Sequence, residues 1–529
     1  MNPWEKIRGR TRGEHERFLC ALSDPRAAQH ALLTQILDAN TTSRYGRRHG
    51  FESIRDADDF RARVPVVRYE DLTEALEDML AGKGNILCAG PVILYERTGG
   101  STSGPKTIPH TEASLGAFRR AIHPWLHDLV ENTPNLGAGK CYWAISPAAR
   151  RHSPGAGDVP VGMQNDLVYF GKELMPLLAG LSAVPPDIAG IPDVDTWRYV
   201  TLRFLLDAED LTMISVWSPT FLTALLEGGL AHSEDLVRDV AQGTLAPPGF
   251  RVKSSGSPFR PRPERARIIE QSLSGPVPDT AGLWPGLALI SAWTSGSAAR
   301  FIPGLRHTFP DVAIQGKGLL ATEGVVTIPL TGHPCPVLAV NSGFYEFLDE
   351  NGRSRLAHEV EAGATYRVLL TTPGGLYRYD IGDRVRVQGW IRQTPMLEFV
   401  GRGERTSDLC GEKLTEEQVV SALSTRQGFS MLAPSINGSP HYRLYVDRDR
   451  YDQDQAGMLA EHVDQLLENN PQYRYARRMR QLGPIEPRLC NSPMDVYARW
   501  AMQRGQRLGD IKPPVLCSES SCLEMLDGH

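Results

Sequence analysis

The stretch TGGSTSGPK, residues 98–106, decides how this chain of 529 residues is interpreted. It follows a short apolar run, Pro91–Tyr95, that predicts a strand, and it precedes a segment from Glu112 to Val130 that predicts a helix. Glycines let backbone N–H groups approach phosphate oxygens closely, hydroxyls add donors and the lysine adds charge. The stretch therefore predicts a phosphate-binding loop, with an exposed Gly/Ser turn as the simpler alternative.

A Walker A loop is a rival interpretation of the same residues. Gly99 and Gly104 have the required spacing, but Pro105 separates Gly104 from Lys106. A Walker A loop needs glycine, lysine and a hydroxyl residue in direct succession. The lysine would be misplaced, so a nucleotide-binding loop of another kind is expected.

Composition predicts a folded, soluble protein. The chain is 41% hydrophobic and 22% charged, with a formal net charge of −5. That balance does not favour nucleic acid or an anionic membrane as a partner. No apolar run approaches a membrane span, the first residues lack a signal-peptide core, and the eight cysteines form no C-x-x-C pair. We expect a cytoplasmic monomer that binds neither nucleic acid nor membrane.

Lysine is rare enough to draw attention. Only nine of the 57 basic residues are lysine, so ordinary surface cations are arginine. A lysine is a compact point charge that arginine does not replace at a phosphate. The nine lysines are therefore candidates for contact with phosphate, and they lie at 6, 83, 106, 140, 172, 253, 317, 413 and 512.

Three further motifs follow in order. The first is Thr322-Glu323 after Gln315–Gly318, which by itself also fits a helix cap or a turn. The second is Tyr377–Val385, where Asp383 at the start of a strand could bind both hydroxyls of a ribose. A hairpin turn capped by aspartate explains this pattern equally well. The third is Gly401–Arg405 with a loop presenting Lys413, which also fits a linker and a capped helix.

Elements along the chain predict two unequal domains. The first 90 residues are expected to be mostly helical, and residues 134–160 are expected to be irregular. Two apolar helices are expected within 197–226, a loop at 254–263 and a buried strand at 287–293. Residues 325–400 show short alternating runs that predict a β-rich subdomain. Helices at 416–423 and 456–467 and a strand at 441–446 then predict a small α+β domain. We predict a large domain over 1–400, a hinge at 401–405 and a small mobile domain over 406–529.

Taken together, the motifs resemble the adenylate-forming superfamily, which includes acyl-CoA synthetases and luciferases. Within it, the chain most resembles the Gretchen Hagen 3 family of acyl acid amido synthetases. Four passages carry this match: the loop with its tail Lys106–Pro109, the run Leu283–Ala299, the block Tyr377–Arg402 and the ending Gly509–Pro513. The resemblance extends over nearly the whole chain and implies an α/β fold of that superfamily.

The resemblance implies a role for each motif. ATP phosphates would be held by Thr98, Gly99, Gly100, Ser101, Thr102 and Ser103 together with Lys106. The adenine and acyl sites would be walled by Gln315, Gly316, Lys317 and Gly318, and by Trp293, Thr294, Ser295 and Gly296. Thr322 would also line the nucleotide site, Thr102 and Glu323 would assist Mg²⁺, and Asp383 would bind ribose. Lys413 and Lys512, on the mobile domain, would face the α-phosphate.

The chain departs from the family pattern at two places. The family's Ser-Ser-Gly-Thr-Thr is Thr98-Gly99-Gly100-Ser101-Thr102 here, which has one hydroxyl fewer. The family's closing Gln-x-Lys-x-Pro-Arg is Asp510-Ile511-Lys512-Pro513-Pro514, which lacks the arginine.

The implied reaction joins a carboxylic acid to an amine, an amino acid by family analogy, through an acyl-adenylate. The residues name no general base. His123 and His127 lie four apart on an expected helix, and His123 is a candidate for the acyl site, although core or surface histidines explain both. With Asp128 they could also suggest a metal site, but no further ligand appears in the sequence. Two alternatives remain: a ligase that forms an acyl-CoA or carrier thioester, and a catalytically weak adenylate-binding protein.

Overall fold

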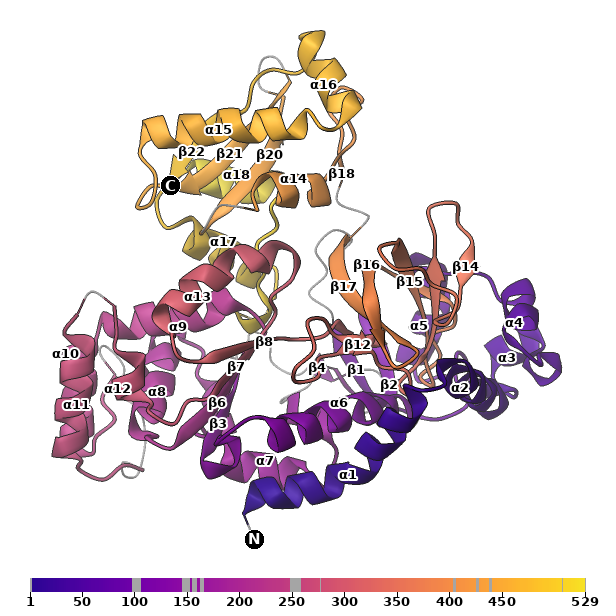
Figure 1. Ribbon diagram of the computed structural model, residues 1–529, viewed down its shortest axis with the longest axis horizontal. Coiled ribbons are helices and arrows are strands. Elements are labelled where there is room, and N and C mark those ends of the chain that lie inside the picture. Colours follow the sequence, from indigo (N-terminus) through magenta and orange to yellow (C-terminus); the bar gives the residue numbers. More distant parts are fainter. Residues whose placement is uncertain are drawn as a thin grey trace. The chain divides into compact units, whose positions relative to one another are not determined.

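The computed structural model describes residues 2–97, 106–144, 153–154, 159–161, 166–247, 258–275, 277–402, 406–424, 428–436, 440–506 and 508–528 (Figure 1). The chain divides into two compact units. The first comprises Met1–Val216, Leu225–Ala292 and Asp311–Phe399, and the second comprises Trp217–Ala224, Trp293–Pro310 and Val400–His529. Most of the predicted phosphate loop (98–105) and part of the predicted hinge (403–405) lie outside the described residues.

The N-terminal part of the first unit is helical, as predicted. It contains α1 (Pro3–Ala21), α2 (Pro25–Asn40), α3 (Arg44–His49), α4 (Ala57–Arg63) and α5 (Thr73–Leu80). The first four begin at a side-chain cap, from Asn2, Asp24, Ser43 and Asp56. Each cap accepts a hydrogen bond from a backbone N–H that the helix itself leaves unsatisfied.

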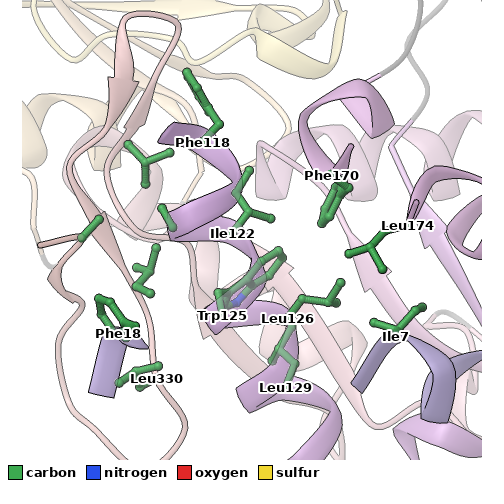
Figure 2. Close-up of a cluster of buried hydrophobic side chains, with 14 of the residues drawn as sticks. Ile7, Phe18, Phe118, Ile122, Trp125, Leu126, Leu129, Phe170, Leu174 and Leu330 are labelled. Atoms are coloured by element: carbon green, nitrogen blue, oxygen red, sulfur yellow. The ribbon is translucent and has the colours of Figure 1, made fainter. Parts of the chain in front are cut away.

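Helix α6 (Glu112–Asn132) is the central support of the first unit. A capping box between Thr111 and Ser114 starts it. Its apolar face packs on α1, and Figure 2 shows Trp125, Leu126 and Leu129 of α6 close to Ile7 of α1 and to Phe170. Burying a large apolar side chain stabilises a fold by roughly 1.5–3 kcal/mol, so this cluster holds α6 firmly in place.

A four-stranded parallel sheet lies in the same unit. Its order is β3 (Lys140–Trp143), β6 (Leu211–Ser215), β7 (Leu289–Ala292) and β8 (Ala313–Gly316). The connections include α7 (Met175–Leu181), α8 (Val194–Asp207), α9 (Pro219–Leu230), α10 (Ser233–Gln242), α11 (Pro263–Leu273) and α12 (Thr280–Leu283).

Two of these strands correct the sequence-based expectation. The strand at 287–293 is confirmed as β7, but β3 lies inside the stretch expected to be irregular, and β6 lies between the two expected helices. Every residue of β6 is buried, so the strand has no alternation of apolar and polar residues to reveal it. Strand β3 has only four residues, too few for a period to show.

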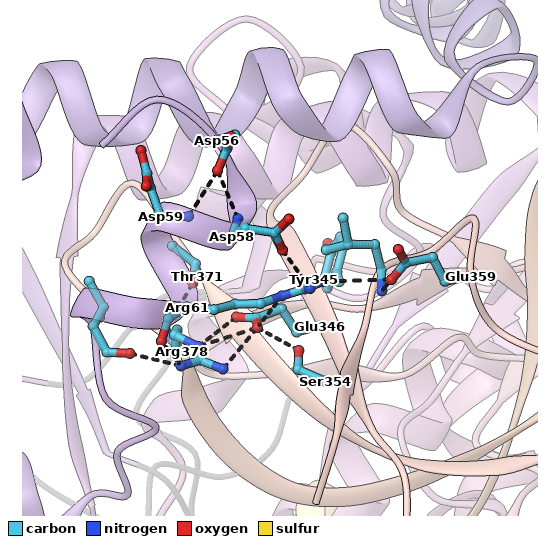
Figure 3. Close-up of polar contacts among 12 residues, drawn as sticks. Asp56, Asp58, Asp59, Arg61, Tyr345, Glu346, Ser354, Glu359, Thr371 and Arg378 are labelled. Carbon is cyan, nitrogen blue, oxygen red and sulfur yellow. Dashed lines mark hydrogen bonds and ion pairs between the residues drawn. The ribbon is translucent and has the colours of Figure 1, made fainter. Parts of the chain in front are cut away.

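The predicted β-rich subdomain is confirmed as a seven-stranded sheet. Its order is β11 (Thr327–Ile328), β12 (Val337–Leu338), β17 (Thr394–Arg402), β16 (Tyr379–Ile391), β15 (Thr365–Thr371), β13 (Phe344–Leu348) and β14 (Ser354–Arg355). A smaller sheet contains β1 (Val92–Arg97), β2 (Thr107–Thr111), β4 (Ser153–Pro154) and β5 (Pro160–Val161). Figure 3 shows a buried polar network that joins α4 to β13 through Arg378 and Glu346.

The second unit contains the predicted α+β fold. A sheet of β20 (Ser430–Ser435), β21 (His441–Asp447) and β22 (Glu486–Cys490) is accompanied by α14 (Glu416–Ala422), α15 (Gln453–Leu467), α16 (Pro471–Arg478), α17 (Pro493–Gln503) and α18 (Ser520–Asp527). A short hairpin of β18 (Thr406–Ser407) and β19 (Leu414–Thr415) precedes α14. Helix α13 (Ile302–Thr308) also belongs to this unit.

Two general features bear on function. Among the described residues, no helix is both long and apolar enough to cross a bilayer. All eight cysteines are free thiols, in keeping with the absence of a disulfide framework from the sequence pattern.

Candidate active site

The carboxyl ends of the parallel strands form a row of four residues. Trp143 pairs with Ser215, Ser215 with Ser291, and Ser291 with Gln315. Partners in register on neighbouring strands point to the same face of a sheet. Ligands of open α/β sheets bind outside the carboxyl ends of the strands, so this row lies where a substrate site is expected.

Helix α6 covers the face to which this row points. Trp125 Nε1 donates a hydrogen bond to Gln315 Oε1 at 2.9 Å. Lys317 follows β8 and reaches back across the sheet, where its Nζ donates to Ser215 Oγ at 2.8 Å and to Ser291 Oγ at 3.3 Å. The same Nζ lies 5.6 Å from the centroid of the Trp125 ring. Two of the residues predicted to wall the adenine and acyl sites therefore have defined partners: Gln315 contacts Trp125, and Lys317 contacts Ser215 and Ser291.

Gly316 and Gly318, the two glycines of the same segment, differ in role. Gly316 ends β8, whereas Gly318 is buried and its backbone packs against β11. A Cβ atom at Gly318 would lie 1.9 Å from the carbonyl oxygen of Thr327, a distance that no side chain tolerates. Gly318 is required there for close backbone packing.

His123 has a structural partner near the same row. Its Nε2 lies 2.9 Å from the carbonyl oxygen of Phe170, whose ring packs on Trp143 with centroids 5.3 Å apart. Burial lowers the pKa of His123 below its ordinary value, against the opposing effect of that hydrogen bond. A neutral ring that donates to a backbone carbonyl orients Phe170.

His127 and Asp128 are occupied by structural contacts. His127 Nδ1 lies 3.1 Å from the carbonyl oxygen of Arg8. Asp128 accepts hydrogen bonds from the backbone and side chain of Thr331, both at 2.7 Å. Within the described part of the chain, no group of three His, Cys, Asp or Glu residues could hold a metal ion.

Thr322 and Glu323 form the turn between two short strands, β9 (Leu320–Ala321) and β10 (Gly324–Val325). The hydroxyl of Tyr379 donates to Glu323 Oε1 at 3.4 Å. Burial first, and the neighbouring carboxylate second, raise the pKa of Tyr379. The tyrosine therefore stays protonated and orients the carboxylate. One carboxylate together with phosphate oxygens is a usual ligand set for Mg²⁺, so Glu323 fits that role.

The two acids of the Tyr377–Val385 block are both buried. Asp380 lies 3.2 Å from Arg367 Nε and 3.5 Å from Arg68 Nε, and it accepts a hydrogen bond from Gly382 N at 3.0 Å. These contacts make Asp380 a structural residue. Asp383 lies in β16 and is 2% exposed.

Lys106 lies at the end of the predicted phosphate loop, just before β2. The backbone N–H of Thr107 donates to the hydroxyl of Tyr69 at 2.9 Å, and Lys106 Nζ lies 5.6 Å from the centroid of that ring. Tyr69 therefore fixes the point where the loop rejoins the sheet. Thr98, Gly99, Gly100, Ser101, Thr102 and Ser103 lie outside the described residues.

In the second unit, a buried carboxylate shapes the loop that presents Lys413. Glu412 is 0% exposed and accepts hydrogen bonds from the backbone N–H groups of Leu409 (2.8 Å) and Cys410 (2.7 Å), and also from the hydroxyl of Tyr442. Lys413 itself has a left-handed backbone, with φ 45°. Such a conformation is costly for a residue with a side chain and is often retained at functional sites.

Lys512 and Trp293 meet within the same unit. Lys512 Nζ lies 4.6 Å from the centroid of the Trp293 ring, and the backbone N–H of Trp293 donates to the carbonyl oxygen of Trp217 at 3.1 Å. Thr294 and Ser295 follow Trp293, and Gly296 takes φ 59° at the start of a short 3₁₀ helix, Gly296–Phe301. The sequence predicted roles for Trp293 and Lys512 but not this contact between them.

Several residues of the site were missed from the sequence. Trp143, Ser215 and Ser291 lie on strands whose alignment defines the row, and two of those strands were not predicted. Glu412 lies in the loop that was predicted to present Lys413, but no role was predicted for it. A glutamate directly before a lysine gives no sign in sequence that its carboxylate is buried.

Comparison with known proteins matches most of the chain to one family. The N-terminal, central and C-terminal domain models of the GH3 family match residues 14–314, 336–402 and 415–521. An indole-3-acetic acid-amido synthetase, GH3.3 of Arabidopsis thaliana, is 23% identical over 95% of this chain and 91% of its own length. A probable indole-3-acetic acid-amido synthetase, GH3.11 of Oryza sativa subsp. japonica, is 25% identical over 94% of this chain and 93% of its own length.

Solved structures agree on the fold. The acyl acid amido synthetase AtGH3.15 in complex with 2,4-DB superposes with a TM-score of 0.87 at 22% identity, over 97% of this chain and 95% of that one. A 2-hydroxyisobutyryl-CoA ligase in its postadenylation state gives a TM-score of 0.56 at 14% identity, over 95% and 91%. The predicted adenylate-forming fold is confirmed. The chain belongs to the GH3 family of acyl acid amido synthetases, the ligases that join a carboxylic acid to an amine.

Proposed function

We propose that this chain uses ATP to convert a carboxylic acid into an acyl-adenylate and then transfers the acyl group to the amine of an amino acid. The relatives named as indole-3-acetic acid-amido synthetases and the relative crystallised with 2,4-DB support an acid of the aryl-alkanoate kind. The observation that carries the proposal is Lys413, whose strained backbone lies next to the buried Glu412, in a chain that matches all three domain models of the family.

The roles of the residues follow from electrostatics. When a carboxylate attacks the α-phosphate, negative charge builds on the phosphate oxygens and on the leaving pyrophosphate. Fixed cations offset this charge without having to reorganise, and Lys413 and Lys512 are the proposed cations. Residues 98–103 and Lys106 are proposed to hold the phosphates. Glu323 and Thr102 would hold Mg²⁺, which when bound supplies additional positive charge at the phosphate oxygens.

Asp383 provides the first test. We expect Asp383→Ala to weaken ATP binding by roughly 2–4 kcal/mol, because two ribose hydrogen bonds to a carboxylate would be lost. Titration calorimetry with ATP measures this, and circular dichroism shows whether the variant is folded. Asp38→Ala, at an exposed position of α2, is the matched control and should bind ATP as the wild type does. A folded Asp383→Ala protein with unchanged ATP affinity would remove Asp383 from the nucleotide site.

The acceptor provides the second test. Incubation with ATP, indole-3-acetate or another aryl acid, and a mixture of amino acids should yield an amide together with AMP and pyrophosphate. Mass spectrometry identifies the product, and parallel reactions contain CoA instead of amino acids. Consumption of CoA without amide would establish the thioester alternative. Failure to release pyrophosphate with any acid, in protein that binds ATP, would favour the weak adenylate-binding alternative.

We also propose that the large domain spans 1–400 and that a small domain, 406–529, rotates about a hinge at 401–405. Gly401 has φ 153°, a backbone conformation that glycine adopts far more readily than other residues. Rotation would let one arrangement serve adenylation and another admit the amine. A monomer in the cytoplasm is the proposed state of the protein.

A further inference from the structure

We propose that Arg300 binds the α-carboxylate of the amino acid that accepts the acyl group, with the hydroxyl of Ser430 as a second contact. This inference rests on the proposed function and makes it more specific, because it names the residue that would distinguish an amino acid from a simple amine. Neither residue was singled out in the sequence.

The first argument is the surroundings of the Arg300 guanidinium. Arg300 lies in the 3₁₀ helix Gly296–Phe301 and is 7% exposed. Its Nη1 donates a hydrogen bond to the carbonyl oxygen of Ser430, the first residue of β20. Among the described residues, its Nε and Nη2 have no acceptor, and the buried Ser430 hydroxyl has no partner either. Burying charged donors without an acceptor is costly, so these groups require a partner from outside the chain.

The second argument is the geometry of the two free donors. Nε–H and Nη2–H point the same way from one edge of the planar guanidinium, and such a pair matches the two oxygens of a carboxylate. We call this pair the Arg300 fork. The guanidinium carbon lies 4.9 Å from the centroid of the Phe301 ring and 6.0 Å from that of Phe429. Aromatic rings attract a cation through their faces, which leaves the fork to an acceptor of another kind.

The third argument is the charge around the fork. Burial lowers the pKa of Arg300 to about 10, and the nearby Glu416 carboxylate opposes this effect. The guanidinium is therefore charged at neutral pH, with an acid close to it. A neighbouring carboxylate disfavours a dianion such as inorganic phosphate more than a zwitterion, whose ammonium group offsets its own carboxylate. Of the proposed reactants, the amino acid has this character.

The fourth argument is the part that each carboxylate plays in the reaction. The acyl acid has to keep an oxygen available to attack the α-phosphate, and a fork that holds both oxygens would prevent that attack. The α-carboxylate of the acceptor forms no new bond. Its amine forms the C–N bond, AMP leaves with the electron pair of the broken C–O bond, and the amine proton passes to solvent. A fork is therefore suited to the acceptor and not to the acyl acid.

The proposed hinge gives the amino acid access to this buried fork. Arg300 precedes residues 401–405 in sequence and Ser430 follows them, although both belong to the second compact unit. Rotation of the small domain would separate Ser430 from Arg300 and expose the fork, in the arrangement that admits the amine. Its return would place the Ser430 hydroxyl against the bound carboxylate.

Binding of amino acids to the full-length chain tests this directly. Each of the standard amino acids is titrated calorimetrically with AMP present, and those that bind are compared with their α-amides, in which the carboxylate is a neutral carboxamide. We expect the wild type to bind at least one amino acid with a Kd below about 1 mM and to prefer it over its α-amide by about 10- to 100-fold, because hydrogen bonds between charged groups are lost. Inorganic phosphate, added as a competitor, should not displace the amino acid.

Replacing Arg300 separates ligand binding from a structural role. Arg300→Met should abolish the preference and weaken amino acid binding by about 10- to 100-fold, while ATP affinity stays within about threefold. Without ligand, this variant should be at least as thermally stable as the wild type, because a buried charge with free donors is removed. Arg300→Lys keeps the charge but not the fork, so it should lose most of the preference.

Two more variants complete the design. Ser430→Ala keeps the backbone carbonyl that accepts from Arg300 Nη1 and removes only the hydroxyl, so it should weaken amino acid binding less than Arg300→Met does. Arg306→Met is the matched control, because Arg306 is exposed on α13 in the same unit. It should behave as the wild type.

The outcomes separate the alternatives. If no amino acid binds the wild type, or if Arg300→Met keeps the preference for acid over amide, the inference is wrong and water fills the fork. If Arg300→Met loses thermal stability but binds amino acids normally, Arg300 only joins the 3₁₀ helix to β20. If inorganic phosphate binds through Arg300 more tightly than any amino acid, the fork is a phosphate site. Amino acid binding through Arg300 without amide formation would instead overturn the proposed function and leave the carboxylate site intact.

Discussion

Lys413→Gly is expected to slow acyl-adenylate formation by about 10²–10³-fold and yet to stabilise the protein by about 1 kcal/mol. The loss follows from removing a fixed cation proposed to face the α-phosphate. The gain follows from the backbone, because Lys413 has φ 45°, where glycine has no Cβ atom to clash. Acid-dependent exchange of pyrophosphate into ATP measures the first effect, and urea denaturation measures the second.

Arg480→Gly is the matched control for this prediction. Arg480 is also left-handed, with φ 56°, and it is exposed in the same unit after α16. Its replacement should give a similar gain in stability with unchanged activity. If Lys413→Gly adenylates at the wild-type rate, Lys413 has no part in the reaction. If it gains no stability while Arg480→Gly does, the left-handed backbone at 413 costs nothing.

Opposite effects on activity and stability would explain why a strained residue is kept at this position. The strain is supported by the side chain before it, since Glu412 accepts two backbone N–H groups and the Tyr442 hydroxyl inside the unit. Asn470 also donates to the Glu412 carbonyl oxygen, at 2.9 Å. Because these contacts fix the loop on both sides, the backbone of Lys413 is held in one place. A cation that stabilises developing negative charge has to be positioned in this way.

The sequence predicted those parts of the fold that carry a local signal. Helix α15 was predicted because apolar residues recur at helical spacing and Asn469–Pro471 follow, and it runs from Gln453 to Leu467. The β-rich subdomain was predicted because its strands are separated by Gly and Pro. Strands β3 and β6 carry no such signal, because β3 has only four residues and every residue of β6 is buried, so neither strand shows a period.

The candidate site shows the same division between local and long-range information. The family resemblance implies that Lys317, with its neighbours from Gln315 to Gly318, walls the adenine and acyl sites. Its partners Ser215 and Ser291 are separated from it by 102 and 26 residues, and only the pairing of β6, β7 and β8 brings them together. Long-range pairing of this kind cannot be read from the spacing of residues along one chain.

The block Tyr377–Val385 shows how a motif can combine two kinds of residue. Of its two acids, only Asp383 was predicted to bind ribose, and Asp380 pairs with Arg367 and Arg68, which makes it structural. Arg378 in the same block is structural as well. Asp383 stays the proposed ribose ligand. The order of charged residues around a turn does not show that Asp380 and Arg378 form ion pairs inside the protein.

The second large effect is expected from Arg378→Ala, which should destabilise the protein by about 3–5 kcal/mol. Figure 3 shows the reason: Arg378 Nε donates to Glu346 Oε2 at 3.0 Å, its Nη2 donates to Oε1 at 3.0 Å, and its Nη1 donates to the carbonyl oxygen of Val64 at 2.8 Å. Glu346 is 1% exposed, so losing Arg378 leaves a buried carboxylate supported by the Ser354 hydroxyl at 2.6 Å and by Arg61, 3.5 Å away. Urea denaturation followed by tryptophan fluorescence measures the loss.

Two further variants show the cause of the stability lost in Arg378→Ala. Arg8→Ala breaks the exposed pair between Arg8 and Glu131, 3.1 Å apart, and should cost at most about 1 kcal/mol. The double replacement Arg378→Met with Glu346→Leu removes both charges and should recover most of the stability lost in Arg378→Ala, because no unpaired charge remains buried. If Arg378→Ala costs no more than Arg8→Ala, the network does not hold α4 on β13. If the double variant is as unstable as the single one, the loss comes from packing and not from the carboxylate left behind.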